Sequence, residues 1–120
     1  MPQPIVIRKG AEEKLFDAQM LAKLEAEAID FRDVGVNDYG LVPGGGFAPQ
    51  VHDDKLEVVT PVALGKVEGP IVRYTDDEGG YEFELGSLDS IVIPRGVKHA
   101  AYNICDTMVA LFITNFSYRD

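Results

Sequence analysis

The sequence has one cysteine, two histidines, few basic residues and no long apolar run. Because Cys105 has no second cysteine to pair with, no internal disulfide can form, which is typical of a reducing compartment. Eleven basic residues against twenty acidic ones give a formal net charge of −9. This balance opposes nucleic acids and anionic membranes as partners, since both need a positive surface. The longest apolar run, Met108 to Ile113, is far below the ~20 residues that cross a bilayer.

The N-terminal segment also lacks the basic start and the long apolar stretch of a secretory signal. We therefore expect a cytoplasmic protein with no membrane partner. A chain of 120 residues is long enough for one core and too short for two. We expect a single domain over residues 1–120, with a strand and a helix in residues 1–33 and a β-barrel in residues 34–120.

Helical periodicity is confined to the N-terminal part of the chain. Phe16, Met20 and Leu24 recur at helical spacing within a stretch that has no proline or glycine. We predict a short strand over residues 5–8 and an amphipathic helix over about residues 12–28. The apolar face of this helix would cover the sheet or a second subunit.

After Asp30, glycine and proline separate short runs that are rich in Val, Ile, Tyr and Phe. Such runs predict strands, and they span residues 58–64, 70–74, 81–85, 89–93, 99–103 and 108–116. Residues 76–80 read Asp-Asp-Glu-Gly-Gly and predict a hairpin loop. Many short strands at this spacing favour a sandwich or a barrel. Tyr74, within one of these runs, is interpreted as a packing residue.

The two histidines lie far apart in the chain, and each has the surroundings of a metal ligand. His99 follows a Pro-x-Gly turn that would direct it back across the sheet, and His52 is followed closely by Asp54 and Glu57. Residues two apart on a strand share a face, so His52 and Asp54 can point inward together. With only two imidazoles, a site needs one or two carboxylates, a donor set that favours Fe(II), Mn(II), Ni(II) or Zn(II) over copper.

Two motifs carry a resemblance to a known family. The first comprises Gly46, His52, Glu57 and Gly65, and the second comprises Pro94, Gly96, His99 and Asn103. Over residues 44–116 the chain resembles a small single-domain cupin. The resemblance implies an all-β, cupin-like double-stranded β-helix or jelly-roll barrel, to which the N-terminal helix is added. It also implies that His52, Glu57 and His99 are metal ligands and that Asn103 is structural.

The chain departs from the family pattern at four positions. Asp54 stands where the family usually has its second histidine, and Glu57 comes early, so a bulge is expected to turn it inward. Pro61 interrupts the strand after Glu57, and Leu88 replaces the glycine that normally precedes the next acidic residue. Three roles are open to Asp54: a fourth ligand, a general base beside the substrate, or a member of a solvated charge cluster.

Three functions follow from this interpretation. The first is a metal-dependent enzyme that acts on a small organic molecule inside the barrel, by oxygenation (as a dioxygenase) or by metal-assisted isomerisation or lyase chemistry. The second is a non-catalytic binding or sensory cupin with a vestigial metal site. The third is a structural dimer partner. A homodimer is expected in all three cases, since sheet edges need covering.

Overall fold

Short runs of β-branched and aromatic residues form antiparallel strands throughout the described part of the chain. The computed structural model describes residues 3–10 and 28–119. The strands within these ranges are β1 (Ile5–Ile7), β2 (Ile29–Leu41), β3 (Gly46–Gln50), β4 (Lys55–Ala63), β5 (Pro70–Thr75), β6 (Glu82–Gly86), β7 (Ser90–Ile93), β8 (His99–Asn103) and β9 (Val109–Tyr118). No helix capable of crossing a membrane occurs among these residues.

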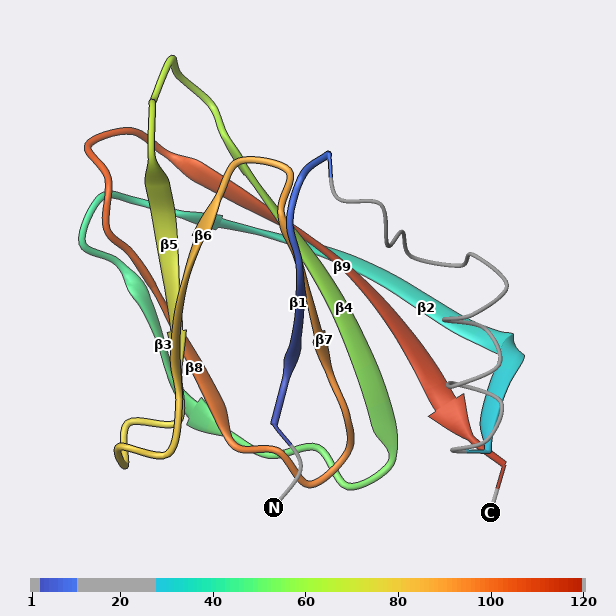
Figure 1. The fold of residues 1–120 in the computed structure, drawn as a ribbon. Helices are drawn as coiled ribbons and strands as arrows, with labels where there is room; N and C mark the ends of the chain where they lie inside the picture. The colour runs from blue at the N-terminus through green and yellow to red at the C-terminus, as the bar shows by residue number, and fades with distance from the viewer. Residues whose placement is uncertain (1–2, 11–27, 120) are drawn as a thin grey trace.

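The strands form two sheets that face each other (Figure 1). The five-stranded sheet has the order β1-β7-β4-β9-β2, and the four-stranded sheet has the order β3-β8-β5-β6. Strands that are distant in sequence are therefore neighbours, as β4 is of β9 and β3 is of β8. The predicted all-β architecture is confirmed. The expected helix lies outside the described residues, except for Ala28, which is in a turn before β2.

The main core lies between the two sheets. Its fully buried members include Val59 from β4, Ile71 and Tyr74 from β5, and Leu111 from β9. A second apolar cluster contains Leu56 and Val58, which alternate along β4 with Glu57 and Val59. Because alternate residues of a strand point to opposite faces, β4 is buried on both sides, and Glu57 shares the face of Val59.

Each of the strands predicted from the sequence is present, although several ends shift by one to three residues. The structure adds β2 and β3, which were not predicted, because Gly35, Gly40 and several Asp and Asn residues lower the β-propensity of this region. The expected interruption at Pro61 is wrong. Pro61 lies inside β4, at a point where pairing with β7 has already ended at Val59, so no ladder bond to β7 is lost. Strand β2 also runs across residue 33, where we placed the boundary of the barrel, and that division stays a prediction.

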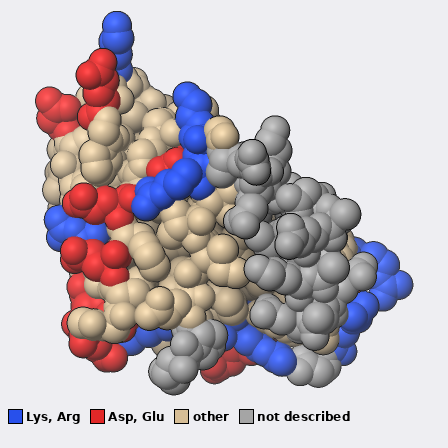
Figure 2. All heavy atoms as spheres, in the orientation of Figure 1, with Lys and Arg blue, Asp and Glu red and all other residues tan. Residues whose placement is uncertain are grey.

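The predicted hairpin loop joins β5 to β6 and carries acidic side chains. Asp76 accepts hydrogen bonds from the backbone of Glu78 at 3.0 Å and of Gly80 at 3.1 Å, and the first of these is the main cause that lowers the Asp76 pKa. Figure 2 shows acidic side chains along the side of the molecule that carries β5 and β6. The strand pair thus presents a negative surface to solvent.

Two glycine-type positions of the motifs have clear structural reasons. A Cβ on Gly46 would lie 2.2 Å from the carbonyl oxygen of Ala101, so β3 can approach β8 only with a glycine there. Leu88 has a φ of 71°, in the left-handed region that favours glycine. The departure from the family pattern at Leu88 therefore places a leucine in a glycine conformation.

Candidate metal centre

Three of the sequence-predicted ligands converge between the two sheets. His52 precedes β4, Glu57 lies within β4, and His99 begins β8. One ligand atom from each of the three lies within 4.8 Å of the others. Nε2 of His52 is 3.0 Å from Oε1 of Glu57, and Nε2 of His99 is 3.4 Å from Oε2 of the same carboxylate. The two imidazole rings are 5.3 Å apart between centroids.

The turn before β8 fixes the position of His99. Gly96 adopts a positive φ of 77°, and its N–H donates to the carbonyl oxygen of His52 at 2.8 Å. This bond ties the two motifs together. Nδ1 of His99 lies 3.0 Å from the carbonyl oxygen of Val97. Because a carbonyl only accepts, the proton is on Nδ1, and Nε2 presents its lone pair to the site.

The register of β4 directs Glu57 into the same space. Pairing of β4 with β9 runs without a shift from Lys55 to Ala63, so Glu57 reaches the interior without the bulge that we expected. Glu57 lies directly opposite Asn115 of β9 and Ile93 of β7. Its side chain is 12% exposed, so its carboxylate lies in a largely water-excluded setting.

The residues present fit a divalent transition metal. Nε2 of His52 and Nε2 of His99 are both buried without a hydrogen-bond partner, so their contacts with Glu57 are close but are not hydrogen bonds. A buried polar atom without a partner is costly. A cation between the two lone pairs and the carboxylate would remove this cost. Two imidazoles with one carboxylate form a donor set that suits Fe(II), Mn(II), Ni(II) or Zn(II).

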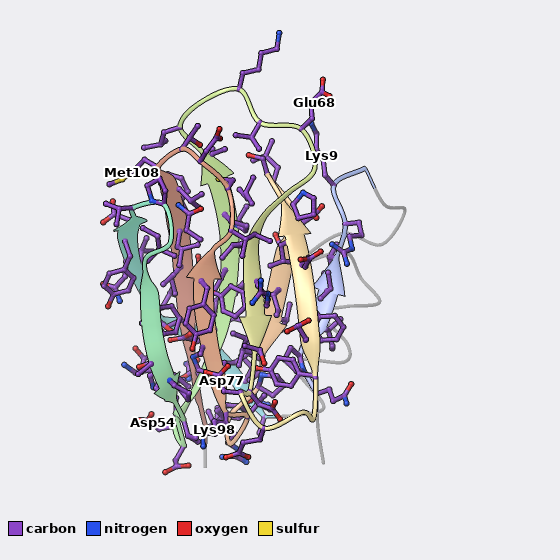
Figure 3. The ribbon with its side chains drawn as sticks, turned by 90° about the vertical axis from the view of Figure 1, so that its left-hand side faces the viewer. Lys9, Asp54, Glu68, Asp77, Lys98 and Met108 are labelled. Atoms are coloured by element: carbon purple, nitrogen blue, oxygen red, sulfur yellow. The ribbon has the colours of Figure 1, made fainter. Side chains whose placement is uncertain are left out.

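Asp54 is not brought to the other three residues. It is exposed, in a bend between β3 and β4, and it is not part of the cluster of ligand atoms. Figure 3 shows it at the lower end of the barrel. We expected His52 and Asp54 to point inward together because alternate residues of a strand share a face. Residues 52–54 do not form a strand, so this expectation does not hold.

A cavity of about 120 Å³ adjoins the cluster. It is lined by His52 and Glu57 and also by polar residues that sequence reasoning did not select, namely Asn37, Gln50, Tyr74 and Asn115. Asn37 and Gln50 belong to the two strands that were not predicted. Asn115 could have been selected from the sequence, because it is an amide within the largely apolar run that forms β9.

Tyr74 and Asn115 have unusual surroundings for polar residues. The Tyr74 side chain is fully buried, and its hydroxyl has no hydrogen-bond partner. Burial and, to a smaller extent, the negative charge of Glu57 raise the pKa of Tyr74 far above its usual value, so the hydroxyl remains a donor. The buried Oδ1 of Asn115 also has no partner.

Asn103 has a different task. Its amide nitrogen donates to the carbonyl oxygens of Leu41 at 2.8 Å and Thr107 at 2.9 Å, and its Oδ1 accepts from the backbone of Cys105 at 2.9 Å. These three bonds hold the end of β8 to the start of the following turn and to the end of β2. Asn103 is 3% exposed, and both the nitrogen and the oxygen of its side-chain amide are hydrogen-bonded.

Several solved structures are similar to this chain. A conserved protein with a double-stranded β-helix domain from Klebsiella pneumoniae matches with a TM-score of 0.58 and 20% identity, over 72% of this chain and 68% of that one. A cupin domain from Bordetella pertussis matches with a TM-score of 0.50 and 26% identity, over 77% and 88%. An oxalate oxidase in complex with glycolate matches with a TM-score of 0.57 and 21% identity, over 74% of this chain but only 44% of that one. No protein-family model and no curated protein sequence matches the chain.

These likenesses define the class of fold. The chain has the double-stranded β-helix fold, built from two facing antiparallel sheets. More particularly, it has the fold of a small cupin domain, as the two motifs predicted. The resemblance is confirmed at this level, and the cluster of His52, Glu57 and His99 is a candidate metal site of this domain.

Proposed function

We propose that this protein is a metal-dependent enzyme that acts on a small organic molecule inside the barrel. The observation that supports this proposal is the convergence of His52 Nε2, His99 Nε2 and the Glu57 carboxylate, with both ring nitrogens buried and without hydrogen-bond partners. These three residues would hold one divalent Fe, Mn, Ni or Zn ion. When bound, such an ion supplies open coordination positions and polarises a substrate oxygen.

The chain itself contributes position and shielding. The turn at Gly96 and the bond from His99 Nδ1 to Val97 hold one ligand, and the register of β4 holds Glu57. The adjoining cavity gives room for a small molecule only. The similarity to an oxalate oxidase, a protein whose substrate is a small carboxylate, supports a small oxygen-rich substrate. Asp54 has no part in this proposal, because it is exposed and outside the cluster.

Metal analysis tests this proposal. Protein purified without chelators and exposed to each of the four metals should hold about one ion per chain in wild type, and this ion should be lost in His99→Ala and Glu57→Gln. Asp54→Asn is the matched control and should keep the ion. Binding that persists in both ligand variants would overturn the proposal. Consumption of O₂ by the Fe(II) form then separates oxygenation from isomerisation or lyase chemistry.

The second candidate is a non-catalytic small-molecule-binding or sensory cupin. It is favoured by one observation: the position where the family usually has a second histidine carries Asp54, and the structure leaves Asp54 outside the cluster. For this candidate, wild type should contain no metal, and chelators should leave its unfolding midpoint unchanged.

We also propose that the protein forms a homodimer through β2. Within residues 3–10 and 28–119, β2 pairs with β9 on one side and has no strand on its other side. Val36 on this strand is 76% exposed, and an edge of this length with apolar side chains favours strand pairing with a second copy. Light scattering should give a dimeric mass, and Val36→Lys should shift it toward the monomer. A monomeric wild type would contradict this proposal.

A further inference from the structure

Tyr74 is a polar residue without a structural task for its hydroxyl. Its ring packs in the main core, where it lies 6.3 Å from the ring of Phe47 in an edge-to-face arrangement. Phenylalanine would fill this space equally well. The hydroxyl instead remains buried and without a hydrogen-bond partner, an arrangement that costs stability. Polar groups retained at such a cost are characteristic of functional sites.

Asn115 repeats this pattern on the opposite sheet. Its direct partner across the ladder is Glu57, so both side chains leave β4 and β9 on the same face. The side chain neighbours along this face of β9 are the apolar residues Ile113 and Leu111. Asn115 is 8% exposed, and its Oδ1 has no partner. The amide thus interrupts an apolar row beside the candidate metal ligands.

Both side chains line the same cavity as His52 and Glu57. One offers a hydroxyl donor and the other a carbonyl acceptor, from opposite sheets. The cavity of about 120 Å³ is smaller than the roughly 300–1,000 Å³ of common ligand pockets, so its occupant is compact.

Charge indicates the sign of the occupant. A divalent cation held by one carboxylate and two neutral imidazoles keeps one net positive charge. Lys55, the only Lys or Arg among the described residues that line the cavity, adds a second positive group at its edge. A monoanion would be favoured over a neutral or cationic molecule in this setting.

We infer that Tyr74 and Asn115 position the substrate, and that this substrate is a compact hydroxycarboxylate. The Tyr74 hydroxyl donates to a carboxylate oxygen, and Oδ1 of Asn115 accepts from the hydroxyl. This inference rests on the proposed function, because it takes the charge and the open positions of the metal as given. It goes further by assigning two positioning residues and a substrate class to the site.

Calorimetric titration of the metal-loaded protein tests the inference. The probes are glycolate and acetate, which differ by one hydroxyl. Tyr74→Phe should weaken binding of both probes about tenfold or more, because each loses a hydrogen bond to a charged group. Asn115→Leu should weaken glycolate binding about tenfold while acetate binding changes little. Metal stoichiometry and metal affinity should match wild type in both variants.

Tyr81→Phe is the matched control for the loss of a hydroxyl. The Tyr81 hydroxyl donates to the carbonyl oxygen of Lys98 at 2.7 Å and lies outside this cavity, so its loss should leave the binding of both probes unchanged. The unfolding midpoint of the metal-free protein gives a readout that is independent of ligand. It should fall in Tyr81→Phe, which loses a hydrogen bond, and should not fall in Tyr74→Phe.

Loss of metal binding and loss of probe binding have different consequences. If wild type binds none of the four metals, the proposed function is overturned, and the inference with it. If wild type binds metal but binds neither probe, the substrate class is wrong. If it binds both probes and the two variants bind them as wild type does, the roles of Tyr74 and Asn115 are wrong while the metal site stands.

Discussion

The two motifs of this domain build their parts of the site in different ways. The second motif spans residues 88–103 when the departure at Leu88 is included. It is held at many points: His99 is 1% exposed and bonded through Nδ1, and Asn103 makes three bonds to backbone groups. The first motif supplies His52 from a loop, with a side chain that is 28% exposed. A firmly held ligand therefore meets a more open one. The second motif therefore determines where the candidate metal site lies, and His52 of the first motif adds a ligand whose position is less constrained.

Removal of Asn103 should have the largest effect on folding. Asn103→Ala leaves the carbonyls of Leu41 and Thr107 and the N–H of Cys105 without their partner, so the free energy of unfolding should fall by roughly 2–4 kcal/mol. Asn103→Asp keeps the acceptor for Cys105 but places an oxygen, and at neutral pH a buried charge, against the two carbonyls, so it should lose at least as much. Urea titration measures both values. A loss below 1 kcal/mol in Asn103→Ala would remove the contrast between the motifs.

Metal binding should stabilise the fold, because one ion would bind ligands from both motifs. At a free metal concentration one hundred times the dissociation constant, the free energy of unfolding should rise by about 2.7 kcal/mol. His99→Ala should abolish this gain in stability, since His99 is the ligand that a hydrogen bond to Val97 holds in place. His52→Ala should only reduce the gain, because His52 lies in a loop and is more exposed. Unfolding midpoints with and without metal report the difference. Equal gains in the two variants would show that the motifs contribute alike.

Asp89, near the start of the second motif, should make the free energy of unfolding depend on pH. Burial alone raises the pKa of Asp89, but hydrogen bonds from the backbone of Lys9 and Gly86 and from Arg8 outweigh it and lower the pKa below its usual value. A lowered pKa means that the folded state favours the ionised form. The resulting stability is present above the unfolded pKa of about 3.9 and is lost as the pH falls through the folded pKa.

Asp89→Asn tests this dependence. The variant should lose about 1–2 kcal/mol of unfolding free energy at neutral pH, and the difference from wild type should shrink as the pH is lowered below about 4. Urea titrations at several pH values give the result. A difference that stays constant down to acid pH would show that the charge of Asp89 has no role in stability.

Replacing Leu88 in the same motif should raise the free energy of unfolding slightly. Because its φ of 71° is strained for a leucine, Leu88→Gly should raise the free energy of unfolding by about 0.5–1 kcal/mol, after the greater freedom of glycine in the unfolded chain is deducted. Leu88→Ala keeps the strain and should give no gain. A stabilised alanine variant would point to the exposed leucine side chain instead of the backbone.

Asp54 should show the smallest effect of all. Asp54→Asn alters an exposed residue of the first motif that lies outside the ligand cluster, so stability should change by less than about 0.5 kcal/mol, and metal affinity should stay the same. Parallel metal and urea titrations measure both. A weaker metal affinity in this variant would bring Asp54 back as a ligand.

The second motif was easier to predict from the sequence than the first, because its conformation depends on residues that are close together in the chain. In the second motif, local chemistry decides the result: Gly96 takes the positive φ that a Pro-x-Gly turn requires, and His99 follows at once on a strand. The apolar run of residues 58–64 likewise predicted most of β4, although not its start at Lys55. These features depend on neighbours in the chain, so pattern and turn chemistry are sufficient to find them.

The remaining features depend on distant contacts. Strand β2 exists because it pairs with β9, against the low β-propensity of its glycines and its Asp and Asn residues. Asp54 was weighed as an inward residue because a strand was assumed where the chain bends. The task of Tyr74 becomes visible only when its hydroxyl is found without a partner beside Glu57, since a tyrosine in an apolar run otherwise indicates packing.

The most direct test of the central claim is an anomalous difference map from crystals loaded with Mn(II) or Zn(II). We expect one strong peak between the sheets, about 2.0–2.3 Å from Nε2 of His52, Nε2 of His99 and a carboxylate oxygen of Glu57. A map without a peak at this position, or with its only peak elsewhere on the molecule, would contradict the claim that these three side chains share one ion.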